Sequence, residues 1–150
     1  MSATIISGKE LSGLIREKIS KESEELSAQY GKRPGLAVIQ VGENPASTIY
    51  VNNKKKACEQ VGFQSFGYSL PESASEKELL DLIDQLNKDD RVHGILCQLP
   101  LPKHMDEFSV ICAIAPEKDV DGFHPVNKGL LSIGRDPLPW SPRQEHRAVA

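Results

Sequence analysis

The sequence predicts an α/β fold, with three α/β/α layers built on a mostly parallel sheet. Two apolar runs, at residues 36–41 and 92–99, are typical of strands that are covered on both faces. Segments with apolar side chains at helical spacing precede and separate these runs. Strands joined through helices of this length imply right-handed crossovers, and such crossovers produce parallel pairing.

The first part of the chain predicts a short strand and a long helix. Residues 3–6 are a short β-branched piece that can form an edge strand. Ser7 or Ser12 can cap the amphipathic helix that follows. Its apolar side chains recur at helical spacing and are Leu11, Leu14, Ile15, Ile19 and Leu26. We expect this helix to end near residues 30–31, before the break at residues 34–35.

Residues 47–62 form the helix around which the rest of the chain is organised. Asn44 or Ser47 can cap its first backbone N–H groups, and Pro45 suits a first helical turn. Gly62 stands where the end of a helix favours a residue with positive φ. An apolar stripe on this helix is expected from Ile49, Ala57, Cys58 and Val61.

The alternation of strands and helices continues after this helix. A second strand is expected at residues 63–70, followed by a loop and an N-cap at residues 71–75. The next amphipathic helix carries Leu79, Leu80, Ile83 and Leu86. The third strand at residues 92–99 is stopped by the prolines that follow it.

The last third of the chain is less regular. The pattern predicts a helix over residues 103–115 and a polar turn over residues 116–125. Residues 127–134 continue as a loop or a short helix. Residues 143–150 have no apolar face, so we expect them to be disordered.

The composition describes a globular protein of one domain or of a small pair. The formal net charge of −3 argues against nucleic acid or an anionic membrane as a partner. No apolar run approaches the length of a membrane span, and no signal-peptide pattern opens the chain. The odd cysteine count, from Cys58, Cys97 and Cys112, predicts free thiols in a reducing cytoplasm.

Several common catalytic and cofactor motifs are absent from the sequence. No G-x-G-x-x-G follows a strand, so the chain carries no dinucleotide fingerprint, and there is no G-x-S-x-G elbow. Gly129 and Gly134 have the spacing of a phosphate loop, but Arg135 and Asp136 follow in place of Lys and Ser or Thr. None of the histidines has the helical spacing of a ligand pair, so we predict no metal site.

What remains is a group of polar side chains that the expected topology gathers at one edge of the sheet. Ligands of parallel sheets lie beyond the carboxyl ends of the strands, where Gln98 and the start of the 47–62 helix should meet. Tyr50 and Lys54 stand one turn apart on a face of that helix. A desolvated lysine beside a neutral amide suits general acid–base chemistry, and a tyrosine can stack on a flat ring. Asp121 can accept paired N–H donors from a heterocycle.

Each of these residues also has a plain structural interpretation. Tyr50 can be the edge of a core, and three consecutive lysines at residues 54–56 are usual on a solvated helix face. Gln98 can cap the end of a strand, and Asp119 and Asp121 can form a turn. Local spacing alone does not decide between these interpretations and a catalytic site.

Three ordered motifs give the sequence a resemblance to a known family. They read Tyr-Val-x-x-Lys-x-Lys at residues 50–56, Gly-Ile-Leu-Cys-Gln-Leu-Pro-Leu-Pro at residues 94–102, and Pro-x-Lys-Asp-Val-Asp-Gly-Phe at residues 116–123, with Asn-x-Gly at residues 127–129. Together they resemble bifunctional methylenetetrahydrofolate dehydrogenase/methenyltetrahydrofolate cyclohydrolase. The resemblance runs from the N-terminus to about Pro142.

The resemblance implies a role for each of the gathered side chains. Lys54 would be essential for the cyclohydrolase step, in which water attacks the methenyl carbon, and Gln98 would hold Lys54 in place. Tyr50 would pack along the aminobenzoate ring of the folate, and Asp121 would bind the pterin edge. The remaining residues of the implied folate pocket are Val51, Asn52, Asn53, Cys97, Leu99 and Pro100.

The resemblance also implies a division into domains. Residues 1–142 would be the folate-binding catalytic domain, residues 143–150 a divergent tail, and the NADP-binding Rossmann-type domain would be missing. In the family a Pro-Cys-Thr-Pro segment leads into that domain, whereas residues 139–142 here read Pro-Trp-Ser-Pro.

The implied function is the interconversion of methylene-, methenyl- and formyl-tetrahydrofolate, with NADP as the cofactor of the full-length family. The intact family implies a cytoplasmic homodimer. We expect the short chain to be impaired, above all as a dehydrogenase. The alternative is a noncatalytic remnant that binds folate or pairs with an intact subunit.

Overall fold

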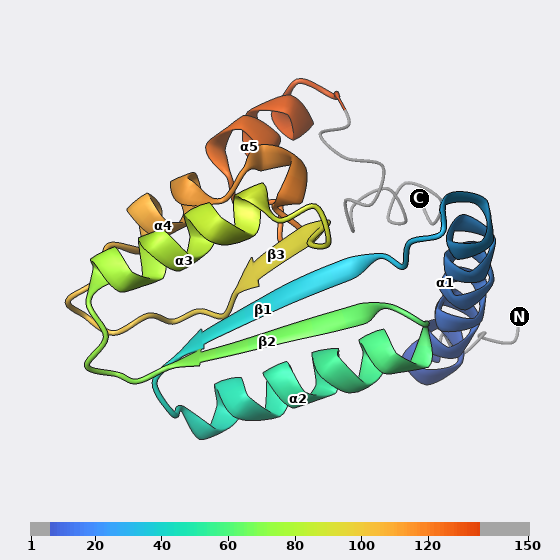
Figure 1. The fold of residues 1–150 in the computed structure, drawn as a ribbon, viewed down its shortest axis with the longest axis horizontal. Helices are drawn as coiled ribbons and strands as arrows, with labels where there is room; N and C mark the ends of the chain where they lie inside the picture. The colour runs from blue at the N-terminus through green and yellow to red at the C-terminus, as the bar shows by residue number, and fades with distance from the viewer. Residues whose placement is uncertain (1–6, 136–150) are drawn as a thin grey trace, which may run out of the picture.

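The computed structural model describes residues 7–135 and shows a parallel sheet flanked by helices (Figure 1). In chain order the elements are α1 (Gly8–Tyr30), β1 (Gly35–Val41), α2 (Pro45–Gln60), β2 (Gln64–Leu70), α3 (Glu76–Lys88), β3 (Gly94–Cys97), α4 (Glu107–Ala113), the 3-10 helix η1 (Pro116–Lys118) and α5 (Pro125–Ser132). The predicted edge strand at residues 3–6, the 139–142 segment and the tail at residues 143–150 lie outside the described residues.

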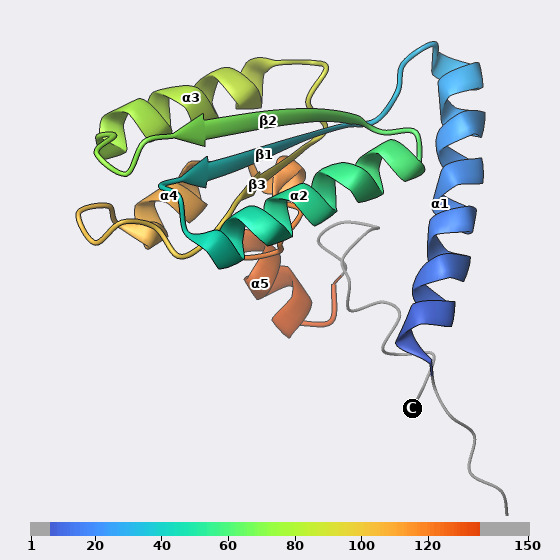
Figure 2. The same ribbon diagram turned by 90° about the horizontal axis from the view of Figure 1, so that it is seen from below.

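The sheet has three strands in the order β2-β1-β3, and both pairs are parallel. Gly35 pairs with Gln64 on one side of β1, and Leu36 pairs with Gly94 on the other. The carboxyl ends of all three strands therefore lie at one edge. Figure 2 shows α3 above the sheet and α2 below it, so the predicted three-layer α/β/α fold is confirmed.

The side chains on the two faces of β1 pack into two different layers of the fold. Ala37, Ile39 and Val41 alternate along the strand and belong to the main apolar core, which α3 completes. The core residues of α3 share one helical face and are Leu79, Ile83 and Leu86. On the opposite face of β1, towards α2, Val38 and Gln40 are also buried. The central strand is thus covered on both sides, as its apolar run predicts.

The helix α1 has the predicted bounds but not the predicted burial. Ser7 accepts a hydrogen bond from the backbone N–H of Glu10, and Gly31 ends the helix with φ of 68°. Leu11 and Leu14 are nevertheless exposed, the latter with 65% of its surface accessible. Figure 2 shows why, since α1 stands beside the sheet rather than across it. Its buried contact is made by a small polar residue, Ser23.

Three predicted boundaries are corrected by local hydrogen bonding. The helix expected at residues 103–115 begins only at Glu107, because the Asp106 carboxylate caps the N–H groups of Phe108 and Ser109. The third strand is confined to Gly94–Cys97 rather than residues 92–99. The polar turn predicted at residues 116–125 opens with η1 and is ended by α5, which begins at Pro125. Of the loop or short helix predicted at residues 127–134, the structure forms the short helix.

None of the helices in residues 7–135 combines the length and the apolar character that crossing a membrane requires.

The loop and N-cap predicted at residues 71–75 are confirmed in detail. Ser75 and Glu78 form a capping box, in which the Ser75 N–H donates to the Glu78 carboxylate at 2.7 Å.

Candidate active site

The helix α2 turns one face towards the sheet, and Lys54 lies on that face. Ser47, Val51, Lys54 and Cys58 recur every three or four residues, and all four are buried or half-buried. The helix begins at Pro45, and the Asn44 side chain accepts a hydrogen bond from the Ser47 N–H at 3.2 Å. Of the two predicted caps, Asn44 is therefore the one used. The predicted positive φ at Gly62 is confirmed at 77°.

A buried amide ties the start of α2 to the carboxyl end of β1. The Gln40 Nε2 donates to Thr48 Oγ1 at 2.9 Å and to the Gly42 carbonyl at 3.1 Å. Gln40 is almost fully buried, so leaving these donors unpaired would carry a desolvation cost. The bonds fix the first turn of α2 at the edge of the sheet where parallel α/β folds bind ligands.

The structure brings Lys54 and Gln98 together across 44 positions of sequence. Lys54 Nζ donates to Gln98 Oε1 at 3.2 Å. The other end of the amide, Gln98 Nε2, donates to the Leu99 carbonyl at 2.7 Å, and the Gln98 backbone N–H donates to the Ile39 carbonyl at 2.8 Å. The amide oxygen is thereby aimed at the amine by bonds that Gln98 makes elsewhere.

Asp121 lies within electrostatic reach of the same amine. Asp121 is an exposed residue, but the protein around its carboxyl partly desolvates it and so raises its pKa above the ordinary value. The nearby charge of Asp119 acts in the same direction. The charge of Lys54 opposes both effects and lowers the pKa of Asp121. An amine, an amide and a carboxyl from α2, the end of β3 and the segment after η1 therefore share one edge of the sheet.

The remaining predicted residues are spread over two environments. Tyr50 is 61% exposed, and Asn52 and Asn53 lie on the exposed side of α2, whereas Val51 is half-buried. Ile49, which we predicted in the buried stripe of α2, is 62% exposed, and that prediction is wrong. The buried face begins with Ser47 instead, and Ile49 points to the other side of the helix.

The residues that follow β3 form the other wall of the site. The Cys97 side chain is buried in the main core, and burial raises the pKa of its thiol to about 12, with a further contribution from the charge of Asp121. Leu99 and Pro100 come directly after Gln98, are joined by a cis peptide bond, and are half-buried and exposed respectively. Glu107 accepts a hydrogen bond from the Leu101 N–H at 3.0 Å, which holds this segment against α4.

Sequence reasoning missed the buried polar network beside Asp121. Lys118, Asp119 and Asn127 all make hydrogen bonds inside the protein, and Asp119 and Asn127 are among its most buried polar residues. The available signal was the dense run of charged residues after Pro116. The sequence analysis selected Asp121 as a ligand-binding residue and gave Asp119 no role beyond turn formation, whereas the structure buries Asp119 in a hydrogen-bonded network.

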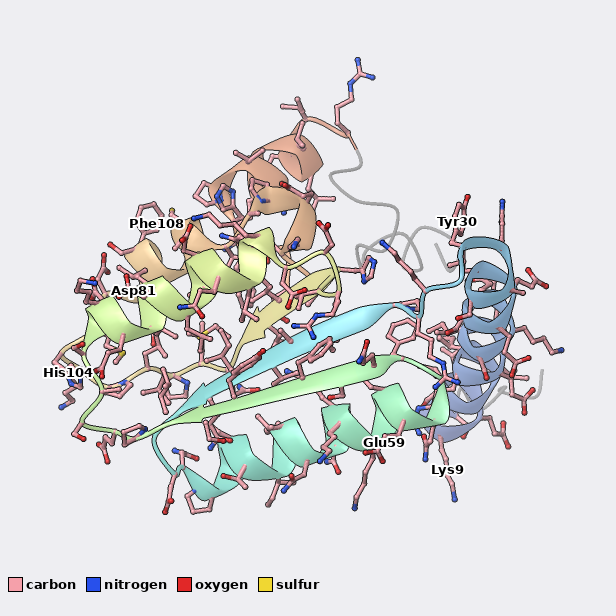
Figure 3. All side chains as sticks on the ribbon, in the orientation of Figure 1. Lys9, Tyr30, Glu59, Asp81, His104 and Phe108 are labelled. Carbon is pink, nitrogen blue, oxygen red and sulfur yellow. The ribbon has the colours of Figure 1, made fainter. Side chains whose placement is uncertain are left out.

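Two further features involve none of the predicted site residues. A cavity of about 400 Å³ opens at the amino ends of the strands, and its lining includes Arg33, Arg91 and His93 but none of the predicted site residues. His104, labelled in Figure 3, donates from Nε2 to the Ala74 carbonyl at 2.8 Å. This bond ties the segment before α4 to the loop before α3.

A parallel α/β domain that gathers an amine, an amide and a carboxyl at the carboxyl edge of its sheet is organised like the domain of a small-molecule enzyme. The comparisons with known proteins specify which. Residues 6–121 match the family described as tetrahydrofolate dehydrogenase/cyclohydrolase, catalytic domain, and the chain belongs to that family.

Individual relatives agree with this membership. The chain is 57% identical over 143 residues to the bifunctional protein FolD of Acetivibrio thermocellus, and 58% identical over 129 residues to that of Aquifex aeolicus. These matches cover 95% and 86% of this chain but 50% and 44% of the relatives. The chain therefore spans about half the length of the curated relatives it matches.

Solved structures show the same correspondence. The bifunctional enzyme FolD from Campylobacter jejuni superposes with a TM-score of 0.87 at 48% identity, over 89% of this chain and 47% of that one. The Trypanosoma brucei enzyme, described as complexed with NADP cofactor and inhibitor, gives a TM-score of 0.86 at 37% identity, over 91% and 47% of the two chains.

Proposed function

We propose that the chain carries the folate-binding catalytic part of a bifunctional methylenetetrahydrofolate dehydrogenase/cyclohydrolase. Its reactions are the oxidation of 5,10-methylenetetrahydrofolate to the 5,10-methenyl form and the hydrolysis of that form to 10-formyltetrahydrofolate. The observation that carries the proposal is the hydrogen bond between Lys54 Nζ and Gln98 Oε1, beside Asp121. Membership of the family supplies the substrate class.

In the hydrolytic step Lys54 moves a proton. Water adds to the methenyl carbon, and Lys54 in its amine form accepts the proton that the water loses. The carbon–nitrogen bond then breaks, and the ammonium of Lys54 returns the proton to the departing ring nitrogen. The hydroxyl left on the carbon loses its own proton to solvent and becomes the formyl oxygen, so hydrolysis of the methenyl cation releases one proton overall. Gln98 holds the amine through a neutral oxygen, so the lysine is positioned without being locked in an ion pair.

The other side chains bind and orient the folate. The Asp121 carboxylate accepts two N–H donors from the amidine-like edge of the pterin. The exposed ring of Tyr50 stacks on the aminobenzoate ring, one turn of α2 away from Lys54. The remaining pocket residues in this proposal are Val51, Asn52, Asn53, Cys97, Leu99 and Pro100.

Hydride transfer requires NADP, and the sequence offers no glycine-rich fingerprint to hold its phosphates. We therefore assign NADP to the half of the relatives that this chain does not match. The 150-residue chain alone should not oxidise methylenetetrahydrofolate. Its cyclohydrolase activity should be weak, because a folate cleft with one wall excludes water poorly.

The test follows ring opening of methenyltetrahydrofolate by the purified 150-residue chain. Lys54→Ala should reduce the rate by at least about 100-fold, the usual contribution of a general acid–base group. Lys55→Ala is the matched control, because this neighbouring lysine is exposed on the other side of α2. Equal rates for the Lys54→Ala and wild-type proteins would reject a catalytic role for Lys54.

Exposed apolar side chains favour a second candidate, a noncatalytic folate-binding or subunit-pairing role in the cytoplasm, with pairing as a homodimer or with an intact relative. Leu14 on α1, Phe108 on α4 and Ile133 after α5 are all more than half exposed, and a partner chain that covered one of these elements would bury its apolar side chain. Light scattering and folate-induced thermal shifts test this role. A stable monomer that folate does not stabilise would exclude both forms of it.

A further inference from the structure

The aspartate two positions before Asp121 has no assigned role. We propose that Asp119 is a positioning residue, which holds Asp121 at the folate edge by fastening the chain segment on which Asp121 lies. We call this segment, residues 116–124, the strap. The inference rests on the proposed function and identifies what places its pterin-binding carboxylate.

The Asp119 carboxylate closes the strap through buried hydrogen bonds. Its Oδ2 accepts from the backbone N–H of His124 at 2.8 Å and from Asn127 Nδ2 at 2.9 Å. Asn127 Nδ2 donates as well to the Pro116 carbonyl at 2.8 Å. Asp119 is 4% exposed and Asn127 is 3% exposed, so the two ends of the strap are joined inside the protein. A buried carboxylate that accepts two N–H bonds has little freedom to move.

The backbone of the strap is fastened to the sheet as well. Asp119 forms a parallel bridge with Ile95, which extends the sheet beyond β3. Val120 then passes directly over Gly94, where a Cβ atom would lie 2.5 Å from Val120 Cγ1. Any larger residue at position 94 would push the strap outward. Gly122 ends this stretch with φ of 65°, a conformation that favours glycine.

Lys118 fastens the strap to α3. Its Nζ donates to the carbonyls of Leu86, Asn87 and Asp89, at 3.0, 2.8 and 3.0 Å respectively. All of its donors are used, and its charge lies at the carboxyl end of the helix, where a cation is favourable. Asp121 is thus carried by a segment attached to α3, β3 and α5.

Asp119 also acts on Asp121 through its charge. Among the described residues the Asp119 carboxylate makes no ion pair, and its hydrogen-bond donors are neutral. The groups that act on Asp121 are Asp119 on the strap and Lys54 on α2, while Cys97 on β3 itself responds to the charge of Asp121. Asp119 and partial desolvation favour the protonated form of Asp121, and Lys54 favours the carboxylate.

Placement and charge can be separated by two substitutions. Asp119→Asn removes the charge but can keep one oxygen in the place of Oδ2 to accept both hydrogen bonds. Asp119→Ala removes the bonds and the charge together. Glu117→Gln is the matched control, because Glu117 is an exposed acid of the same strap.

The first measurement is the titration of the Asp121 carboxyl by NMR in the ligand-free chain, with the signal assigned through Asp121→Asn. Asp119→Asn should lower the pKa of Asp121, because a neighbouring negative charge is lost. Glu117→Gln should leave it unchanged. A pKa of Asp121 that is unchanged in both Asp119→Asn and Asp119→Ala, with the fold intact, would overturn the inference, because neither the charge nor the hydrogen bonds of Asp119 would then act on Asp121.

The second measurement is the split between KM and kcat in methenyltetrahydrofolate hydrolysis. Asp119→Ala should raise KM about tenfold and change kcat less, because a displaced Asp121 loses pterin contacts while Lys54 stays in place. The KM of Asp119→Asn should lie between the KM values of wild type and Asp119→Ala. Equal KM values for wild type and Asp119→Ala would contradict the positioning role.

The two measurements also separate this inference from the proposed function. A wild-type chain that neither binds nor hydrolyses the folate would refute the proposed function, while the NMR titration would still decide whether Asp119 acts on Asp121. If Asp119→Ala does not fold, Asn127→Ala replaces it in the KM measurement, because it removes one donor to Asp119 Oδ2 and keeps the Asp119 charge; an unchanged KM in Asn127→Ala would then contradict the positioning role.

Discussion

The two sides of the candidate site are held in very different ways. Asp121 lies on a strap attached by a buried carboxylate, a sheet bridge and a lysine with three carbonyl partners. Lys54 projects from α2, and within residues 7–135 its amine makes one hydrogen bond, to Gln98. The placement of Asp121 is therefore coupled to the stability of the fold. The placement of the Lys54 amine is not coupled to stability in this way. Substitutions near Lys54 should therefore change activity without changing stability, whereas substitutions in the attachment of the strap should change stability.

The largest effect on stability is expected at Lys118. Lys118→Met removes three hydrogen bonds from a charged donor and a favourable charge from the carboxyl end of α3. We expect the free energy of unfolding to fall by about 2–3 kcal/mol, measured by urea denaturation.

Lys77→Met is the matched control for that measurement. Lys77 is an exposed lysine near the start of α3 that pairs with Asp81 one turn later, and exposed pairs of this kind contribute little to stability. Equal losses for the two variants would mean that the strap is not fastened through Lys118, and the contrast between the two sides of the site would disappear.

A smaller effect, on rate rather than stability, is expected at Gln98. Gln98→Leu removes the acceptor that orients the Lys54 amine. Ring opening of methenyltetrahydrofolate should slow roughly tenfold, which corresponds to about 1.4 kcal/mol of activation free energy. The free energy of unfolding should change by less than about 1 kcal/mol.

Gln64→Leu serves as the control, since this exposed glutamine lies at the opposite end of the sheet, at the start of β2. If Gln98→Leu destabilised the chain as much as Lys118→Met, the amine would be coupled to the fold after all. The proposed separation of activity from stability would then be wrong.

The parts of the fold that depend on local chemistry could be predicted from the sequence. The apolar run in β1 gave a strand covered on both faces, Pro45 and Gly62 marked the ends of α2, and Ser75 capped α3. Each of these signals acts within a few residues of the structure it specifies, so no knowledge of the tertiary arrangement was needed.

The predictions that failed concerned burial, which depends on how the helices pack against the sheet. Leu14 and Ile83 have the same helical spacing pattern around them, yet Ile83 is fully buried and Leu14 is exposed, because α3 crosses the sheet and α1 stands beside it. Within α2, Ile49 was assigned to the buried stripe although Ser47 occupies that place. Periodicity identifies an apolar face but not the partner that covers it.

The candidate site was predicted unevenly for the same reason. Residue types and topology sufficed to suggest Lys54 and Gln98 at one edge, and the structure joins them by a hydrogen bond. The roles of these residues in catalysis stay predictions. The difference between Asp119 and Asp121 had no local signal, because it depends on Asn127 folding back onto the strap.

The smallest effect is a pH dependence at Asp121 that tests how the strap holds this carboxyl. Partial desolvation raises the pKa of Asp121 in the folded state above its unfolded value. The folded state therefore binds a proton at Asp121 more tightly than the unfolded state does. This preference stabilises the fold when the pH is below the pKa of Asp121 in the unfolded chain, and the contribution is lost as the pH rises through the pKa of Asp121 in the folded chain. Asp121→Asn should be slightly more stable than wild type at neutral pH, with no difference in acid, and the gain should be small because Asp121 is exposed and solvent screens its charge.

Asp106→Asn gives the opposite sign and so controls for general effects of acid. Hydrogen bonds from Ser109 and Phe108 lower the pKa of Asp106, so its carboxylate stabilises the fold above the unfolded pKa and loses this contribution as pH falls through the folded pKa. Asp106→Asn should therefore be less stable than wild type at neutral pH. Urea denaturation of both variants at neutral and acid pH makes the comparison. If Asp121→Asn were less stable than wild type at neutral pH, the Asp121 carboxylate would itself stabilise the strap. That result would contradict the division of roles in which Asp119 fastens the strap and Asp121 binds the ligand.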